Sequence, residues 1–264
     1  MATYSHIELT DEEMIDCLLW GKIKKEEIIK QQKLREKELA NRKFASQRLD
    51  FNAIKTFMIA RAKDIFKYEF CVDENNEMFF NLLSYYFIGD EDGFLKQCDL
   101  IKRKDERLEV KNPSIKKGIM LVGNCGTGKT DMMKLFAKNT RQVYFMRSAK
   151  QISKEYLAQK NIPEEYTVPW KLLINDPATL YQPIAGLCID DFGAEEVKNS
   201  FGNKSNVIGD LIEERYNAGY TGVLLHATSN LTAEQLRDYY GERVISRMRQ
   251  IFNFIKFPGD DRRK

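Results

Sequence analysis

A glycine-rich octapeptide near the middle of the chain contains residue types that bind phosphate. Its glycines allow successive backbone N–H groups to point at one phosphate chain, and a helix that begins directly after it adds positive charge. A lysine in this pattern can reach the β- and γ-phosphates, and a threonine can bind Mg²⁺. The pattern G-x-x-x-x-G-K-[ST] is matched in full by Gly123, Asn124, Cys125, Gly126, Thr127, Gly128, Lys129 and Thr130. The sequence therefore predicts a site for ATP and Mg²⁺.

The segments on both sides of this octapeptide support that interpretation. Residues 118–122 are apolar and predict a short buried strand, and residues 131–138 predict a helix with apolar positions at Met132, Met133, Leu135 and Phe136. A strand, a glycine-rich loop and a helix in this order are the context that the motif requires. The alternative is a glycine-rich turn that happens to precede a lysine, and the full pattern with these flanks argues against it.

Two adjacent acids follow a second apolar segment. ATP hydrolysis requires an acid that holds Mg²⁺ and a group that orients or deprotonates the attacking water. Asp190 ends the apolar run that begins at Leu187, and we predict that it binds Mg²⁺ together with Thr130. Asp191 is then the predicted water-activating carboxylate. The two acids could instead form a turn or a helix cap, an alternative that the phosphate-binding motif disfavours.

Three further polar side chains are candidates for the same chemistry. Asn230 follows a predicted buried strand over 222–228 and could hydrogen-bond the attacking water or the γ-phosphate. By itself, the pair Ser229-Asn230 would indicate only a turn. Arg243 and Arg247 are four residues apart and share one face of a predicted helix. They could pair with local acids, or one of them could supply positive charge to the nucleotide of a neighbouring subunit.

The elements that would position these residues alternate along the chain. Thr232 and Gln235 have the spacing of a capping box, which predicts the start of a helix. Alternating strands and helices favour a mostly parallel sheet with both faces covered. The other predicted helices are 149–159, 168–175, 206–218 and 242–249, and the predicted strands are 118–122, 142–146, 187–191, 222–228 and 251–257.

The first quarter of the chain differs in composition from the rest. The protein has 264 residues and a net charge of +3, but residues 22–67 contain 14 Lys or Arg against 6 Asp or Glu. This region lacks Pro and Gly, so we expect a basic, helical N-terminal region over 1–70, either an interaction arm or only a solvated helix. A nucleotide-binding domain is expected over 71–264, beginning with an apolar linking helix at about 76–88.

The remaining composition predicts a reduced, soluble protein. The five cysteines include no CxxC pair, and neither His6 nor His226 has a ligand partner at helical spacing. No apolar run is long enough to span a bilayer, and the start does not have the pattern of a secretory signal. We therefore expect a cytoplasmic location and no membrane partner.

The order of the motifs resembles the AAA+ ATPases of the DnaC-type replicative helicase loader family, and the related IstB-type transposition ATPases. The similarity covers roughly residues 115–263. It consists of the octapeptide at 123–130, Leu-Cys-Ile-Asp-Asp-Phe-Gly at 187–193, Glu-Glu-Arg-Tyr at 213–216, Ala-Thr-Ser-Asn-Leu at 227–231, and Tyr-Gly-Glu-Arg-Val-Ile-Ser-Arg-Met at 240–248.

This resemblance implies a fold and a set of residue roles. The implied fold is an α/β P-loop NTPase with a parallel five-stranded sheet flanked by helices, an all-α N-terminal region and no C-terminal lid domain. Asn230 corresponds to sensor 1, Arg247 to the arginine finger that reaches the neighbouring protomer, and Arg243 to a second family arginine. The segment 147–186 corresponds to paired helices that contact single-stranded DNA, and the run 259–263 resembles a family ending with an arginine.

The implied function is ATP-dependent loading of a replicative helicase onto single-stranded DNA, with self-association through the ATP sites. The sequence departs from the pattern in its Asp-Asp pair, in His226 before sensor 1, and in an N-terminal region that matches no known helicase-binding domain. Alternatives are an IstB-like ATPase that acts with a transposase on duplex DNA, a nucleotide-gated adaptor with little turnover, and, more remotely, a P-loop kinase.

Overall fold

The computed structural model of the chain describes residues 51–139, 141–159, 162, 166, 186–195, 198–200, 203–219 and 224–262. The chain divides into two units, 1–48 and 49–264, and every described residue belongs to the second. The predicted helix at 168–175 and the basic region as far as residue 50 lie outside the described residues. The domain boundary near residue 70 stays a prediction.

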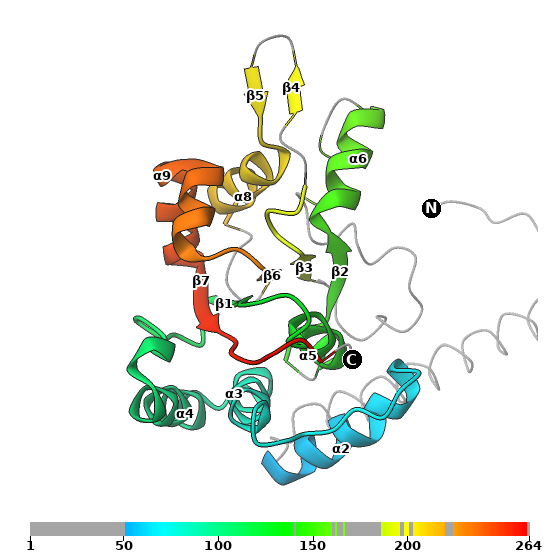
Figure 1. Ribbon diagram of the computed structural model, residues 1–264, viewed down its shortest axis with the longest axis vertical. Coiled ribbons are helices and arrows are strands. Elements are labelled where there is room, and N and C mark those ends of the chain that lie inside the picture. The colour runs from blue at the N-terminus through cyan, green and yellow to red at the C-terminus, as the bar shows by residue number, and fades with distance from the viewer. Residues whose placement is uncertain are drawn as a thin grey trace, which may run out of the picture. The chain divides into compact units, whose positions relative to one another are not determined.

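Five parallel strands form the centre of the second unit (Figure 1). Their order across the sheet is β2-β3-β6-β1-β7, so β6 lies between the strand before the glycine-rich loop and the strand that ends in the two acids. Parallel strands end at the same edge, which brings the segments that follow β1, β3 and β6 together. The strands are β1 (Gly118–Val122), β2 (Tyr144–Ser148), β3 (Gly186–Asp190), β6 (Leu225–Ser229) and β7 (Phe252–Lys256).

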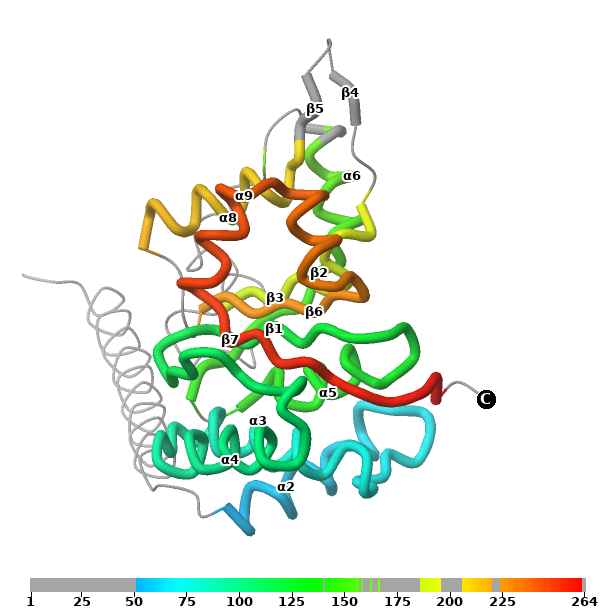
Figure 2. Tube along the Cα trace, turned by 60° about the vertical axis from the view of Figure 1, so that its left-hand side comes forward, coloured from blue at the N-terminus to red at the C-terminus, as the bar shows by residue number. Residues whose placement is uncertain are grey.

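Helices cover both faces of this sheet (Figure 2). On one face, Ile119 and Leu121 of β1 pack with α2 (Phe51–Ile65), α3 (Glu77–Ile88), α4 (Glu91–Lys104) and α5 (Lys129–Phe136). On the other face, Met120 packs with α6 (Ala149–Gln159), α8 (Val207–Asn217) and α9 (Ala233–Ile251). Burial on both faces explains why β1 and β3 are runs of apolar residues rather than alternating patterns.

The three helices before β1 pack as a layer on α5 and the sheet. Ile54 and Met58 of α2 are buried, and the rings of Phe80 and Phe87 in α3 lie 5.6 and 5.1 Å from the ring of Phe136 in α5. Burying an aromatic ring of this size contributes about 2 kcal/mol to stability. These contacts hold α3 against the end of α5.

Helix α4 was not predicted, because residues 89–93 have the composition of a turn. The structure shortens that turn to two residues. Gly89, with φ 80°, ends α3, and the side chain of Asp90 accepts a hydrogen bond from the backbone N–H of Gly93 and so begins α4. Gly93 lies inside the helix, where a Cβ would overlap the ring of Tyr85. The glycine thus permits close packing of α3 and α4 rather than breaking a helix.

The other predicted strands and helices that fall on described residues are present, with shifted ends. β2 begins at Tyr144 rather than at 142, and α5 begins at Lys129 rather than at 131. The capping box of Thr232 and Gln235 begins α9, and Gly241, with φ 81° and ψ 161°, divides that helix into the two predicted segments. A short hairpin of β4 (Lys198–Ser200) and β5 (Asn203–Ser205), and a 3₁₀ turn at Glu106–Leu108, were not predicted.

His226 fits the core by forming a hydrogen bond with a neighbouring strand. It is fully buried in β6, and its Nδ1 accepts a hydrogen bond from the backbone N–H of Ile119 in β1, at 3.0 Å. Its ring lies 4.7 Å from that of Tyr144. The histidine therefore replaces an apolar residue by supplying an acceptor to the neighbouring strand.

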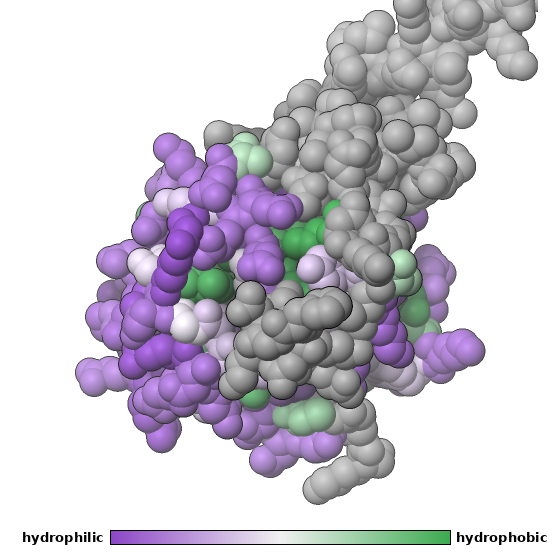
Figure 3. Space-filling model, turned by 90° about the horizontal axis from the view of Figure 1, so that it is seen from above, coloured by the Kyte–Doolittle hydropathy of each residue, from purple (hydrophilic) through white to green (hydrophobic). Residues whose placement is uncertain are grey.

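The described surface is mostly hydrophilic on the face that Figure 3 shows, with small hydrophobic areas between charged groups. Among the described helices, none is both long enough and apolar enough to cross a bilayer.

Candidate functional site

The glycine-rich loop joins β1 to α5, as the motif requires, and two of its glycines adopt conformations that other residues rarely take. Gly126 and Gly128 have φ values of 76° and 95°, in the left-handed region. Gly123 is needed for another reason, because a Cβ there would overlap the backbone oxygen of Phe257, just beyond β7. The loop is therefore a backbone cradle without side chains at the positions where it turns, which suits close approach of a phosphate chain.

The side chain of Lys129 is buried in this loop. The residue is only 4% exposed, and its Nζ donates hydrogen bonds to the backbone oxygens of Gly123 (2.9 Å) and Asn124 (2.6 Å). It also donates to Oδ1 of Asn230, at 2.8 Å. The ammonium group is thus held between the loop and the residue that follows β6. A cation in this position can pair with the phosphates that the cradle accepts.

Thr130 and Asp190 meet beside the lysine, although they come from α5 and β3. Oγ1 of Thr130 donates to Oδ1 of Asp190 at 2.8 Å, and the hydroxyl of Thr228 in β6 donates to the same oxygen at 2.6 Å. Hydroxyl and carboxylate oxygens are the ligands that Mg²⁺ prefers, and this ion usually takes its remaining ligands from water and phosphate. The pair therefore fits the predicted Mg²⁺ ligands.

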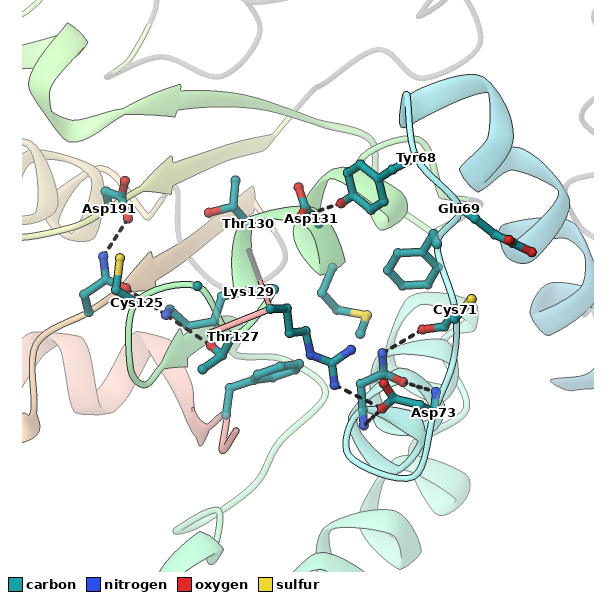
Figure 4. A pocket seen from close by; sticks show the side chains of 18 residues that line it. Tyr68, Glu69, Cys71, Asp73, Cys125, Thr127, Lys129, Thr130, Asp131 and Asp191 are labelled. Atoms are coloured by element: carbon teal, nitrogen blue, oxygen red, sulfur yellow. Dashed lines mark hydrogen bonds and ion pairs between the residues drawn. The ribbon is translucent and has the colours of Figure 1, made fainter. Parts of the chain in front are cut away.

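The chain turns at Asp191, directly after the end of β3. The φ of 54° at Asp191 is unusual for a residue other than glycine. The backbone N–H of Asp191 donates to Oγ1 of Thr228 at 3.0 Å, and that of Phe192 donates to the backbone oxygen of Thr228 at 2.8 Å. This turn places Asp191 in the lining of the cavity that the glycine-rich loop also lines (Figure 4).

Asn230 connects the lysine to this second acid. Its Oδ1 accepts from the ammonium of Lys129, and its Nδ2 donates to Oδ1 of Asp191 at 3.0 Å. The charges of the two partners require this orientation of the amide, because a cation needs an acceptor and a carboxylate needs a donor. The position of β6 between β1 and β3 is what places Asn230 between them.

One side of a cavity of about 640 Å³, which we call the phosphate cavity, is lined by Lys129, Thr130, Asp191 and Asn230. The opposite side is formed by residues that the sequence analysis did not select, including Tyr68, Phe70 and Asp73 from the segment between α2 and α3. Phe257 and Arg262, after β7, complete it. Only the resemblance of run 259–263 to a family ending gave any sign of Arg262.

The segment after β7 crosses the glycine-rich loop. The backbone N–H of Arg262 donates to the oxygen of Gly126 at 2.9 Å, and its guanidinium pairs with Asp73 at 3.0 Å. Burial opposes the change, but the hydrogen bond and charge of Arg262 lower the pKa of Asp73. On the other side of the cavity, Tyr68 donates to Asp131 at 2.6 Å, and burial followed by this bond raises the pKa of Tyr68 (Figure 4). Both ends of the segment 68–73 are therefore tied to the loop region.

The two predicted arginines lie elsewhere. Arg243 and Arg247 are in the second half of α9, and both contact Glu213 of α8, at 3.0 and 3.8 Å. Arg247 also donates to Asn217 at 2.9 Å and lies over the ring of Tyr216, 4.9 Å from its centre. Neither arginine lines the phosphate cavity. Within one chain, then, they pair with local groups and do not reach the glycine-rich loop.

A second cavity, of about 700 Å³, lies on the other side of Asn230 between α9, β7 and the segment before β1. Its floor includes Leu231, Ile245 and Phe254. Two acids line it, of which Glu109 is paired with Lys102 at 2.5 Å. Five cationic residues line this cationic cavity: Lys111, Lys117, Arg237, Arg249 and Lys256.

A five-stranded parallel sheet flanked by helices, with the loop between β1 and α5, is consistent with a P-loop NTPase. No protein-family model matches the chain, and no curated protein matches it. Among solved structures, it is similar to a crystal structure described as a proposed primosome component from Streptococcus pyogenes serotype M3. The identity is 17% and the TM-score is 0.39, over 68% of this chain and 91% of that chain. A similarity at this level does not establish a function, so a function can be inferred only from the residues of the site.

Proposed function

We propose that this protein binds ATP with Mg²⁺ and hydrolyses it. The observation that supports this most strongly is the hydrogen-bonded series Lys129–Asn230–Asp191, next to the contact between Thr130 and Asp190. The cation of Lys129, which lies in the glycine-rich loop, is thus linked through the neutral amide of Asn230 to the carboxylate of Asp191. These are the groups that phosphoryl transfer to water requires.

Each residue has a distinct role in the proposed reaction. The backbone of the loop and Lys129 hold the phosphates, and Thr130 and Asp190 hold the metal. When bound, Mg²⁺ neutralises charge on the phosphate oxygens. Asp191 accepts a proton from the attacking water, and Asn230 orients that water and the carboxylate. Of these side chains Lys129 is buried, which strengthens its attraction for the phosphates.

The test of this proposal is hydrolysis and binding by two variants with a matched control. We expect Lys129→Ala to lose binding of a fluorescent ATP analogue and hydrolysis together. We expect Asp191→Asn to bind the analogue within about threefold of wild type but to hydrolyse ATP at least about 100-fold more slowly, because the proton acceptor is lost. Lys138→Ala, which removes an exposed lysine just after α5, should change neither.

Two results would count against parts of this proposal. If Asp191→Asn hydrolyses ATP like wild type, the assignment of the catalytic acid is wrong. If the wild type binds ATP but turns over negligibly, and Asp191→Asn changes nothing, the nucleotide-gated adaptor is favoured instead.

We further propose that the protein acts in DNA replication by loading a replicative helicase onto single-stranded DNA. The motif order from 123 to 248 supports this, as does the separation of Arg243 and Arg247 from the phosphate cavity of their own chain. In this proposal ATP sites form between protomers, and Arg247 of one protomer contacts the γ-phosphate held by the next. The IstB-like alternative predicts preference for bent duplex DNA and dependence on a transposase.

The cationic cavity supports the nucleic-acid part of this proposal. Cations beside an apolar, partly aromatic floor suit a strand whose phosphates are anionic and whose bases stack. Lys111 and Lys256 are exposed, so their ammonium groups are accessible to phosphates. Because Asn230 borders both cavities, a strand bound here would lie next to the catalytic residues.

We therefore expect the double variant Arg237→Ala/Lys256→Ala to bind single-stranded oligonucleotide more weakly. The slope of log affinity against log salt should fall by roughly one to two, because about one counterion is released for each phosphate contact. The control is Lys96→Ala/Lys134→Ala, which removes two exposed cations from the helices on the opposite face of the sheet. Fluorescence anisotropy at several salt concentrations measures both. Equal slopes in the two double variants would exclude the cationic cavity as the nucleic-acid site.

A further inference from the structure

A buried carboxylate holds the turn that follows the two acids. Glu195 is only 5% exposed, and its Oε2 accepts a hydrogen bond from the backbone N–H of Gly193 at 2.9 Å. Its Oε1 accepts from the hydroxyl of Tyr240, and its backbone oxygen accepts from the hydroxyl of Tyr239. Burial raises the pKa of Glu195 despite these bonds. A buried acid is costly unless it is hydrogen-bonded, so its presence here needs a reason.

The turn that Glu195 holds is the one that carries Asp191. The backbone N–H of Ala194 donates to the oxygen of Asp191 at 2.9 Å, which closes the turn. Gly193 has a φ of 89°, and a Cβ there would overlap Leu231, the residue after Asn230. The unusual φ of Asp191 is therefore part of a tight turn with little freedom, and Glu195 fixes its far end.

The same carboxylate joins this turn to α9. The ring of Phe192 lies 4.6 Å from that of Tyr240, so the two segments share an apolar contact as well as the hydrogen bonds. Tyr240 directly precedes Gly241, where α9 is interrupted. Arg243 and Arg247 follow within the next two turns. The helix that carries both arginines is thus connected to the turn that carries Asp191 through Tyr239 and Tyr240, and Glu195 accepts hydrogen bonds from both.

We propose that Glu195 is a positioning residue for Asp191, and that its bond to Tyr240 makes the rate of hydrolysis depend on the position of α9. This proposal rests on the proposed ATPase function. Glu195 does not line the phosphate cavity, so its loss should alter the geometry of Asp191 without removing any group that binds nucleotide. The expected signature is a change in kcat with little change in KM.

The experiment compares Tyr240→Phe, Glu195→Ala and Glu195→Gln with the wild type. We expect Tyr240→Phe to lower kcat about tenfold, with KM and the affinity for a fluorescent ATP analogue within about twofold. Glu195→Ala should lower kcat further, and Glu195→Gln should recover part of the loss, because an amide can still accept the hydrogen bond from Gly193. The matched control is Tyr216→Phe, whose hydroxyl donates to Gln250 at 2.8 Å between α8 and α9; its kcat should not change.

Hydrogen exchange provides a readout that does not depend on turnover. We expect faster amide exchange over residues 191–195 in Tyr240→Phe than in wild type or Tyr216→Phe, since the turn loses its attachment. If wild type hydrolyses ATP and Tyr240→Phe matches it in kcat and in exchange, the positioning role is wrong while the ATPase proposal stands. If KM rises with kcat unchanged, Glu195 belongs to nucleotide binding and the proposal also fails. If the wild type does not hydrolyse ATP, the ATPase proposal itself fails, and the catalytic role of Glu195 fails with it.

Discussion

At the scale of single residues, the site depends on backbone positions as much as on charged side chains. Gly126 shows this most clearly. Its φ is 76°, and a Cβ added to it would overlap the carboxylate of Asp261 in the segment that crosses the loop. Gly219 has nearly the same φ, 75°, but open space around it. Substitution of Gly219 therefore tests the backbone strain alone. Substitution of Gly126 tests the same strain together with the effect of a side chain in the loop.

We predict that Gly126→Ala loses ATP binding, whereas Gly219→Ala binds ATP like wild type. Both variants should lose about 1 kcal/mol of unfolding free energy, because an alanine is strained at positive φ. Only Gly126→Ala places a methyl group in the cradle. Denaturant unfolding and titration with a fluorescent ATP analogue measure the two effects. Normal binding by Gly126→Ala would mean that the cradle does not hold the phosphates.

The residues of the site that lie in local sequence motifs were predictable. The residues that reach the site from distant segments of the chain were not. Lys129, Thr130, Asp190 and Asp191 follow from motifs at the ends of apolar strands. The bridging geometry of Asn230 requires the strand order, with β6 between β1 and β3. Tyr68, Phe257 and Arg262 reach the phosphate cavity from distant segments, and no local pattern marks them.

At the scale of elements, the turn after β3, which carries the proposed catalytic acid Asp191, is connected to the first half of α9. Glu195 is the only acid whose carboxylate the structure describes as bonded to both. Its pKa is raised, first by burial. The native state therefore retains a proton at pH values where the unfolded chain has lost it. The stability that this group contributes is present below the unfolded pKa and is lost as the pH rises through the folded pKa.

We therefore predict that Glu195→Gln gains stability relative to wild type as the pH rises from the ordinary glutamate pKa of about 4.3 toward neutrality. The amide cannot ionise, so the variant avoids the cost of a buried charge. Denaturant unfolding at a series of pH values measures the difference. Glu234→Gln, at an exposed position in α9, removes the same charge and should show no such trend. A constant difference between Glu195→Gln and wild type across this range would contradict the account.

Most elements were predictable from the alternation of apolar strands and capped helices, as the capping box at Thr232 shows. The error at α4 has a specific cause. Gly89 and Gly93 both have the appearance of turn residues, but only Gly89 is one; Gly93 is a packing glycine against Tyr85. The sequence does not distinguish a glycine needed for its φ from one needed for its size.

At the scale of the whole molecule, the described unit separates two groups that hydrolysis would need. The phosphate cavity lies where β1, β3 and β6 end, and Arg243 and Arg247 lie on α9, beside Glu213 of α8. The helices α5 and α9 pack on opposite faces of the sheet (Figure 1). If either arginine acts on ATP, it acts on the ATP of another protomer. The central claim is therefore a shared site.

The measurement that tests this claim most directly is ATP hydrolysis by Lys129→Ala and Arg247→Ala, separately and mixed. Lys129→Ala keeps Arg247, and Arg247→Ala keeps an intact glycine-rich loop. We predict that each is nearly inactive alone, and that the mixture regains a substantial part of wild-type activity at interfaces that combine an intact loop with an intact arginine. Normal hydrolysis by Arg247→Ala alone, at concentrations where the protein is monomeric, would contradict the shared site.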